Sequence, residues 1–343
     1  MQKKVFRFSK KTVSYYLDAA FADLGKLVDK KHAAVVTDEN VFNAFKKKFD
    51  GWKTIVIKAG EEYKVQQTVD EIVKQLIEME ADRKTFLIGV GGGVITDITG
   101  YVGSIYMRGI KYGFVPTTLL AMVDASIGGK NGIDVGVYKN LVGTINQPDF
   151  LLYDVSLLKS LPQQEWVNGF AEIIKHACIK DAAMFRELEK HKLSYYQKNK
   201  EALLKLIRKN TLLKSNVVQN DEFENGERQL LNFGHTLGHA IEKVYGLSHG
   251  QAVSIGMVAA CIISENYSGF NNTSQVTSTL EKYGLPTQAD FDPEKVLNMM
   301  KHDKKKVKES INYVLLDKIG HAKTKTIPVN ELEKIVYSII SAR

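Results

Sequence analysis

The stretch Thr85-Phe-Leu-Ile-Gly-Val-Gly-Gly-Gly-Val-Ile-Thr-Asp97 decides the fold, because an apolar run passes through a glycine-rich turn directly into a helical pattern. In such a turn the glycines let the backbone approach a pyrophosphate, and the helix N-terminus offers unpaired N–H groups to it. Val94 stands where the third glycine of the usual dinucleotide fingerprint would be. Glycine after a strand also makes ordinary tight turns. The stretch therefore predicts a strand, a turn and a helix. The turn has two interpretations, a nucleotide-binding site and an ordinary tight turn of the chain.

Alternating strand and helix patterns surround this stretch. Residues 33–37 and 54–57 are β-branched apolar runs, and residues 65–80 repeat apolar side chains at helical spacing. This alternation predicts a parallel sheet. Asp38 follows the first run, and Gly60-Glu-Glu-Tyr-Lys64 follows the second. Because the carboxyl ends of parallel strands border the ligand crevice, we expect these polar residues to face a bound nucleotide.

The sequence pattern changes near residue 160. Beyond Pro162 the strand signal nearly vanishes and long helical patterns follow, roughly over 163–190, 198–218, 230–245 and 250–268, with 311–316 as the one later strand-like run. A chain of 343 residues is too long for one compact core. We therefore predict two domains: residues 1–160 form a Rossmann-like α/β nucleotide-binding domain, and residues 161–343 form an all-α domain.

The composition is that of a soluble globular protein, with 44% hydrophobic and 25% charged residues. No apolar run is long enough to predict a membrane span, and residues 1–8 lack the apolar core of a signal peptide. Cys178 and Cys261 each lie in an apolar helical stretch, as expected of reduced, buried thiols. These features predict a cytoplasmic protein without a membrane partner.

The net charge of +8 is compatible with nucleic acid, a membrane surface or a small acidic substrate. The densest basic run, residues 301–308, has no interleaved aromatic residues and belongs to no nucleic-acid-binding module, so nucleic acid is not an expected partner. The other notable cations stand singly beside glycine, asparagine or carboxylates: Arg108, Lys130, Lys139, Lys175, Lys214 and Arg228. That distribution favours a small polyanion.

Three histidines, His235, His239 and His249, gather in one short part of the sequence. The first two are four residues apart, so on a helix their imidazoles project from one face. A metal that stays open to substrate commonly has two nitrogen ligands and a carboxylate, and Glu172, with Lys175 one turn further on, is the best candidate for the carboxylate. Spacing alone leaves open which of the first two histidines is the ligand. The alternative is a set of hydrogen-bonded core histidines and a surface ion pair.

Residues 116–148 are dense in polar residues and glycine. A loop of this length without secondary structure of its own is usually functional or disordered, and its specific polar groups argue for function. Asp124, Lys130 and Asn140 could bind hydroxyl groups, and Lys139 could bind a phosphate. The alternative is an ordinary surface loop capped by Asp and Asn turns.

These motifs together closely resemble the 3-dehydroquinate synthase family. The resemblance covers nearly the whole chain, and its most specific parts are residues 124–130, Lys139-Asn-Leu-Val-Gly-Thr, Ala171-Glu-Ile-Ile-Lys, Leu231-Asn-Phe-Gly-His-Thr-Leu-Gly-His-Ala and Ser248-His-Gly. It implies an N-terminal nucleotide-binding α/β domain and a C-terminal helical domain with the active site between them.

The resemblance also implies a role for each matching residue. The implied metal ligands are Glu172, His235 and His249. The implied substrate contacts are Arg108, Asp124, Lys130, Asn140, Lys175, Lys214, Arg228, Asn232, His239 and a lysine of residues 304–306, assigned as Lys305. The implied nucleotide site comprises Asp38, Asn40, Glu61, Lys64, Gly92, Gly93, Asp97, Thr117, Thr118, Asp124, Lys130, Lys139, Leu157 and Ser160.

The implied reaction converts 3-deoxy-D-arabino-heptulosonate 7-phosphate into 3-dehydroquinate and phosphate. It uses NAD, which is reduced and reoxidised within one turnover, and zinc or cobalt as a Lewis acid. In the family, homodimers are typical. The alternatives are another sugar-phosphate cyclase, a metal-dependent polyol dehydrogenase that releases NADH, and a non-enzymatic metal-stabilised nucleotide-binding module.

Some positions depart from the family pattern. Leu157 and Ser160 replace a bulkier residue and a threonine, His176 replaces a tyrosine, and Gln251 replaces a glutamate. Thr96 replaces a glycine and adds a side chain where the backbone and the cofactor approach closely, so it bears on how tightly NAD binds.

Overall fold

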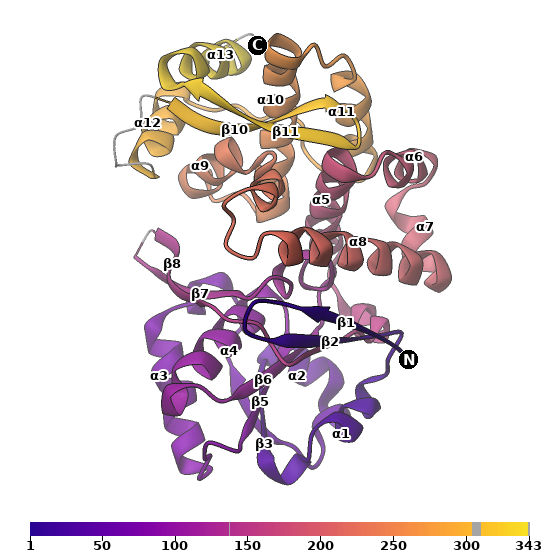
Figure 1. Ribbon diagram of the computed structural model, residues 1–343, viewed down its shortest axis with the longest axis vertical. Helices are drawn as coiled ribbons and strands as arrows, with labels where there is room; N and C mark the ends of the chain where they lie inside the picture. Colours follow the sequence, from indigo (N-terminus) through magenta and orange to yellow (C-terminus); the bar gives the residue numbers. More distant parts are fainter. Residues whose placement is uncertain (137, 304–309, 342–343) are drawn as a thin grey trace. The chain divides into compact units, whose positions relative to one another are not determined.

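The computed structural model of the chain describes residues 1–136, 138–303 and 310–341 (Figure 1). These residues form two compact units, one of residues 1–165 and 204–223, the other of residues 166–203 and the described residues from 224 onward. Residues 204–223 thus group with the N-terminal unit. The domain boundary at residue 160 stays a prediction.

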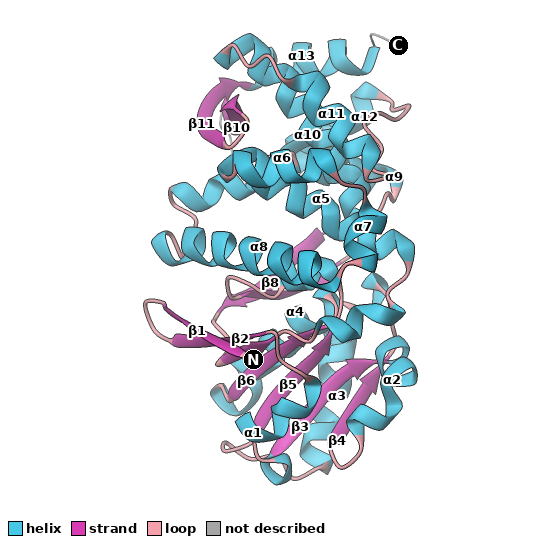
Figure 2. Cartoon of the chain, turned by 90° about the vertical axis from the view of Figure 1, so that its right-hand side faces the viewer, coloured by secondary structure: helices cyan, strands magenta, loops and turns pink. Residues whose placement is uncertain are grey.

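The N-terminal unit is built on a seven-stranded sheet with the strand order β1-β2-β9-β6-β5-β3-β4 (Figure 2). Its strands are β1 (Gln2–Arg7), β2 (Thr12–Leu17), β3 (Ala33–Asp38), β4 (Lys53–Ile57), β5 (Phe86–Gly91), β6 (Lys111–Pro116) and β9 (Phe150–Leu152). Only β1 and β2 pair antiparallel, and the other neighbours pair parallel. The predicted α/β unit with a parallel sheet is therefore confirmed.

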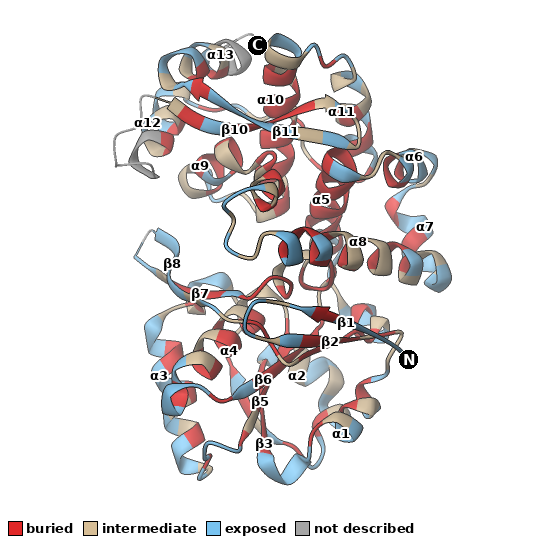
Figure 3. Ribbon diagram, viewed as in Figure 1, coloured by how far each residue is buried: buried red, intermediate tan, exposed pale blue. Residues whose placement is uncertain are grey.

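The strand order reverses between β3 and β5. The expected ligand crevice therefore lies at the carboxyl ends of these two strands. β5 lies inside the sheet, and its Leu87, Ile88 and Val90 are fully buried (Figure 3). The chain then enters α4 (Gly93–Ile105) through Gly92, as the glycine-rich stretch predicts. The helix packs against β5 and β6 with Ile98 fully buried. Helices α1 (Leu24–Leu27), α2 (Glu39–Phe45) and α3 (Gln66–Glu78) complete this part of the chain.

Residues 116–148 have secondary structure of their own, so the prediction of an irregular loop is wrong. A π-helical turn covers Ala121–Ala125, and an antiparallel ribbon pairs β7 (Lys130–Val135) with β8 (Tyr138–Ile145). Nearly every described residue of β8 is exposed. A strand without a buried face shows no alternation of apolar and polar residues, and the sequence pattern therefore gave no strand signal.

The C-terminal unit is mostly helical, as predicted. Its main helices are α5 (Gln163–Lys180), α6 (Ala182–Lys190), α7 (Leu193–Lys198), α9 (His235–Tyr245), α10 (His249–Ser268), α11 (Thr273–Lys282), α12 (Pro293–Asp303) and α13 (Val329–Ser341). The first residues of α5 belong to the N-terminal unit, as does most of α8 (Lys200–Asn220). The predicted helix 163–190 is broken at Asp181, whose side chain caps α6 by accepting a hydrogen bond from the Met184 amide. None of the described helices is long and apolar enough to cross a membrane.

The C-terminal unit also contains a β-hairpin, so the prediction of an all-α domain is incomplete. The strand-like run 311–316 lies in β10 (Ser310–Lys318), which pairs antiparallel with β11 (His321–Pro328). Most residues of β11 are exposed, and several are lysine or threonine, so the second strand has no apolar pattern to predict it. Cys178 and Cys261 are buried free thiols, as expected.

Candidate metal centre and nucleotide site

Glu172, His235 and His249 come together in the C-terminal unit. Glu172 lies in the middle of α5, and the two histidines are the first residues of α9 and α10. The Glu172 Oε1 atom is 3.1 Å from His249 Nε2 and 3.5 Å from His235 Nε2. Two ligand atoms that are each about 2.1 Å from a tetrahedral zinc ion lie about 3.4 Å apart. The donor set and its spacing therefore fit a tetrahedral metal ion with one position left open.

A close helix contact brings these histidines together. Gly234, with φ +80°, ends the turn before α9, and α10 passes directly over it. A Cβ atom added at Gly256 would lie 1.9 Å from the Gly234 carbonyl oxygen, and one added at Gly238 would lie 3.0 Å from the Ala252 carbonyl oxygen. Only glycine allows this approach of two helix backbones. The contact holds His235 on α9 near His249 on α10.

Hydrogen bonds set the tautomer of His235. Its Nδ1 is 3.1 Å from the Phe233 carbonyl oxygen, which can only accept a hydrogen bond. Nδ1 therefore carries the proton, and the lone pair of Nε2 faces Glu172. Burial and the nearby Lys175 charge hold the pKa of His235 well below its usual value, so the ring is neutral. A neutral imidazole with its second N–H bound to a carbonyl oxygen is the form that ligates metals.

His249 has a carboxylate on each side. Its Nε2 faces Glu172, and its Nδ1 is 3.6 Å from an oxygen of Glu242. Burial alone would lower the pKa of His249, but the contacts with Glu172 and Glu242 raise it to about 10. The carboxylates of Glu172 and Glu242 thus favour a positive charge at the position of the His249 ring. Glu242 was not predicted from the sequence, although it follows His235 by seven residues on one face of α9.

Lys175 pairs with Glu172 one helical turn away, and both side chains are buried, at 2% and 0% exposure. The ammonium group contacts Oε2, the oxygen that does not face the histidines. A buried carboxylate needs a partner of opposite charge or hydrogen-bond donors to remain ionised. The pair therefore keeps Glu172 ionised and fixes its orientation.

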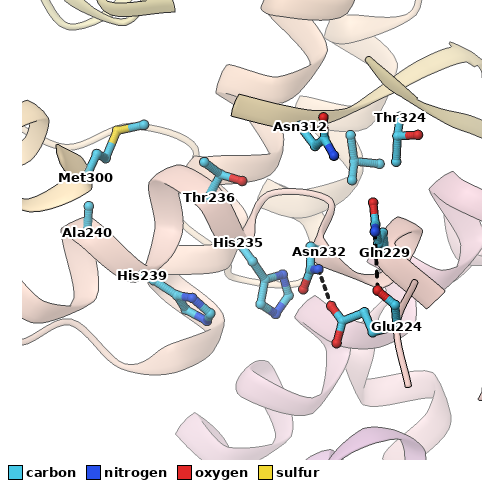
Figure 4. A pocket seen from close by; sticks show the side chains of 11 residues that line it. Glu224, Gln229, Asn232, His235, Thr236, His239, Ala240, Met300, Asn312 and Thr324 are labelled. Carbon is cyan, nitrogen blue, oxygen red and sulfur yellow. Dashed lines mark hydrogen bonds between the residues drawn. The ribbon is translucent and has the colours of Figure 1, made fainter. Parts of the chain in front are cut away.

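A cavity of about 520 Å³ opens beside these residues within the C-terminal unit (Figure 4). Its lining comprises Glu224, Gln229, Asn232, His235, Thr236, His239, Ala240, Met300, Asn312, Val314 and Thr324. Three of these were predicted from the sequence, namely Asn232, His235 and His239. Glu224 was missed; its carboxylate accepts a hydrogen bond from Asn232 Nδ2 at 2.5 Å. The predicted Lys305 lies outside the described residues, and Arg228 is buried in the 3-10 helix Glu227–Asn232.

His239 is exposed at the edge of this cluster. Its ring centroid is 5.1 Å from that of His235 and 6.5 Å from that of His249. The distances leave His239 next to the two ligand candidates, in the lining of the cavity. His235 shares a possible ligand group with Glu172 and His249, and His239 shares one with Glu242 and His249, so the choice of His235 as the ligand follows the resemblance and stays a prediction.

In the N-terminal unit, predicted nucleotide-site residues lie at the carboxyl ends of neighbouring strands. Asp38 ends β3, Gly92 follows β5, and Thr117 follows β6 and donates its amide hydrogen to the Gly91 carbonyl oxygen at 2.9 Å. Asp38 accepts a hydrogen bond from the Val41 amide and thereby caps α2, and burial raises its pKa. These residues, with Gly93, Thr118 and the exposed Asn40, gather at the switch point of the sheet.

The buried Lys64 is the centre of a polar network in the same unit. Its Nζ lies 2.5 Å from an Asp97 oxygen and 2.6 Å from Asn140 Oδ1, with Glu61 at 3.9 Å. Lys139 is also 3.9 Å from Glu61. Burial alone would lower the pKa of Lys64, but Asp97 and Glu61 raise it, while burial raises the pKa of Asp97. The network joins predicted site residues from three separate stretches of sequence.

Lys214 and Asp124 form a second pair in the N-terminal unit. The Lys214 ammonium is 2.7 Å from Asp124 Oδ1 and donates a hydrogen bond to the Asp124 carbonyl oxygen at 2.9 Å. Asp124 sits in the π-helical turn, a local distortion that is frequent at functional sites. The sequence predicted both residues as substrate contacts, but it could not predict that they bind each other.

The remaining predicted residues differ in how far they are exposed. Arg108, Lys130 and Ser160 are exposed, and Arg108 has φ +69°. Leu157 is 1% exposed and belongs to the apolar core under the sheet. Only its backbone could therefore reach a ligand.

Two departures from the family pattern have a clear structural role. Thr96 is buried, and its hydroxyl donates a hydrogen bond to the Gly93 carbonyl oxygen at 3.0 Å within α4. Its polar atom is therefore used inside the helix. Gln251 accepts a hydrogen bond from the Ser248 amide at 3.1 Å and completes the cap of α10, whose first residue is His249. The amide oxygen keeps the capping function of a glutamate without its charge.

Comparisons with known proteins agree over both units. Family models described as 3-dehydroquinate synthase N-terminal and C-terminal match residues 54–168 and 169–306. The 3-dehydroquinate synthase of Leptospira interrogans is 38% identical over 328 residues, covering 92% of this chain and 90% of the relative. That of Pyrococcus abyssi is 42% identical over 287 residues, covering 83% of this chain and 85% of the relative.

Solved structures show the same fold. A 2-deoxy-scyllo-inosose synthase complexed with carbaglucose-6-phosphate, NAD+ and Co2+ has a TM-score of 0.85 at 22% identity, covering 98% of this chain and 99% of that one. The 2-epi-5-epi-valiolone synthase ValA of Streptomyces hygroscopicus, with NAD+ and Zn2+ bound, has a TM-score of 0.84 at 26% identity, with both chains fully covered. The identities to the synthases above exceed these values and extend over most of the chain. The chain belongs to the 3-dehydroquinate synthase family.

Proposed function

We propose that this protein is a 3-dehydroquinate synthase, a phosphate-eliminating lyase that converts 3-deoxy-D-arabino-heptulosonate 7-phosphate into 3-dehydroquinate and phosphate. The observation that carries the proposal is the placement of Glu172, His235 and His249 within ligand distance of one another, beside a polar cavity. Relatives of that name at 38–43% identity support it. A homodimer and a cytoplasmic location remain predictions.

We infer that Glu172, His235 and His249 hold a zinc or cobalt ion, and two structural neighbours bind Zn2+ or Co2+. When bound, such an ion acts as a Lewis acid toward substrate oxygens. The protein's own contribution is the orientation of the ligands. Lys175 keeps the Glu172 carboxylate ionised, and the Phe233 carbonyl group fixes the tautomer of His235.

We infer that the glycine-rich turn and the residues at the ends of β3, β5 and β6 hold NAD, which the same neighbours bind. NAD supplies a hydride acceptor that can return the hydride within the turnover. The N-terminus of α4 offers unpaired amides for a pyrophosphate. The Lys64 network would fix the neighbouring segments, because Lys64 ties Asp97 on α4 to Asn140 on β8.

Charge and hydrogen bonding assign the substrate groups by class. We infer that the cations predicted from the resemblance, namely Arg228, Lys214, Lys130 and Arg108, bind the carboxylate and the phosphate dianion. His239 and Asn232 line the cavity and offer hydrogen bonds to hydroxyl groups. Such contacts hold the substrate in a fixed orientation for elimination and ring closure. The retained Arg228 and Asn232 favour a substrate that bears a carboxylate over the substrates of other sugar-phosphate cyclases.

The proposal is tested by measuring phosphate release from the heptulosonate phosphate with catalytic NAD and zinc. We expect release that a metal chelator abolishes and added zinc restores. Release from a seven-carbon sugar phosphate that lacks the carboxylate should be slower by more than about 100-fold, because the proposed contact between Arg228 and the carboxylate would be lost. Equal release from both sugars would indicate another sugar-phosphate cyclase. No release from either sugar would contradict the proposal.

A further inference from the structure

Glu242 is a buried acidic residue that none of the roles above uses. It lies in α9, is 8% exposed, and places a carboxylate oxygen 3.6 Å from Nδ1 of His249. It follows His235 by seven residues, so both side chains leave the same face of the helix. Burying a carboxylate is costly unless it is paired or hydrogen-bonded, and the His249 ring supplies one such contact.

The two histidine ligands differ in what holds their second nitrogen. His235 has a backbone carbonyl group, from Phe233, at its Nδ1. His249 begins α10, and its side chain is 29% exposed, so packing holds its ring less firmly. The group facing its Nδ1 is the Glu242 carboxylate, at ion-pair distance. A small change in the ring's orientation would turn this contact into a hydrogen bond.

A hydrogen bond at Nδ1 has a specific consequence for His249. It places the proton on Nδ1 and leaves the lone pair of Nε2 directed at the point that Glu172 and His235 also face, since Nε2 is 3.1 Å from Glu172 Oε1. A carboxylate in this position also makes the imidazole a stronger donor to a metal. Without it, the ring could rotate or carry its proton on Nε2.

We propose that Glu242 is a positioning residue that orients His249 and selects the tautomer in which His249 ligates the metal ion. The inference rests on the proposed metal site. The role we assign to Glu242 is a contact with the ligand His249, at its Nδ1. Residues that hold metal-bound histidines in this way typically change metal affinity by about 10- to 100-fold.

The test measures metal affinity directly, by competition between the purified full-length protein and a chromogenic chelator for Zn2+ or Co2+. The variants are Glu242→Ala, which removes the carboxylate, and Glu242→Gln, which keeps one acceptor oxygen. Glu265→Gln changes an exposed carboxylate on α10 and is the matched control. Circular dichroism confirms that each variant is folded, and the visible absorption of bound Co2+ reports the ligand geometry.

We expect one metal ion per wild-type chain. The Glu242→Ala variant should bind it about 10- to 100-fold more weakly than wild type, with an altered Co2+ spectrum. The metal affinity of Glu242→Gln should lie between those of wild type and Glu242→Ala. The control should match wild type. If Glu242→Ala does not fold, the comparison of Glu242→Gln with the control decides the question. Wild-type affinity and an unchanged Co2+ spectrum in both Glu242 variants would overturn the inference. Failure of the wild-type chain to bind metal would instead overturn the metal site on which it rests.

Discussion

Replacing Glu172 with glutamine is expected to abolish metal binding and with it phosphate release. The amide removes the one negative ligand of the trio and leaves the Lys175 ammonium buried at 2% exposure without its carboxylate. Removing one partner of a buried ion pair costs about 3–5 kcal/mol of stability. Loss of a residue that only orients a ligand lowers metal affinity by up to roughly 100-fold. We expect the loss of the ligand Glu172 to lower metal affinity by more than that. The measurements are metal content after dialysis, phosphate release and chemical denaturation.

A second variant separates the loss of metal from the loss of stability. The double variant Glu172→Gln, Lys175→Met removes both buried charges, so it should recover most of the stability that the single variant loses. It should still bind no metal. The surface variant Glu187→Gln, in an exposed ion pair with Lys190, should match wild type in both respects. A Glu172→Gln protein that keeps its metal would show that Glu172 is not a ligand.

Replacing Gly256 with alanine should separate the two helices that carry the histidines. The new Cβ atom would lie 1.9 Å from the Gly234 carbonyl oxygen and 2.9 Å from the Gly238 amide nitrogen. Both are backbone atoms, so no side-chain rotation relieves the clash. Overpacking of this kind costs about 1–3 kcal/mol and occasionally more, and we expect the upper part of that range. Because α9 and α10 must move apart, metal binding and phosphate release should fall together.

The matched control for this variant is Gly25→Ala in α1. An added Cβ there meets only the end of the Lys30 side chain, at 4.0 Å. Since alanine favours a helix over glycine by up to about 1 kcal/mol, this variant should be as stable as wild type or slightly more stable. Thermal denaturation followed by circular dichroism compares the two. Normal stability and metal affinity in Gly256→Ala would show that the close helix contact does not hold the site.

Elements with a strong periodic pattern could be predicted from the sequence. The buried runs of β3 and β5, the glycine turn before α4 and the helices α9 and α10 all follow from apolar spacing and turn residues. The strands β8 and β11 could not be predicted, because their residues are largely exposed and show no apolar face. The buried part of β7 contains Asn131 and Gly132, which give no apolar alternation either. Similarly, the break at Asp181 involves a local capping hydrogen bond inside a continuous helical pattern.

The members of the candidate site were easier to predict than their pairings. Residue types and the resemblance to the family identified Glu172, His235 and His249, but the choice of tautomer depends on the Phe233 carbonyl oxygen, which has no sequence signal. The contact of Lys64 with Asn140, 76 residues apart, depends on the tertiary fold. Glu242 could have been found, since it shares a helix face with His235, and that spacing is visible in the sequence.

The central claim is that the chain oxidises and reduces its substrate again within one turnover while phosphate leaves. The most direct test is one reaction of the heptulosonate phosphate with the zinc-loaded protein and NAD at a small fraction of the substrate concentration, in which phosphate and NADH absorbance are followed together. We predict that phosphate release far exceeds the NAD supplied, with no net accumulation of NADH. Accumulation of NADH in step with substrate consumption, ending when the NAD is exhausted, would contradict the claim and show a dehydrogenase instead.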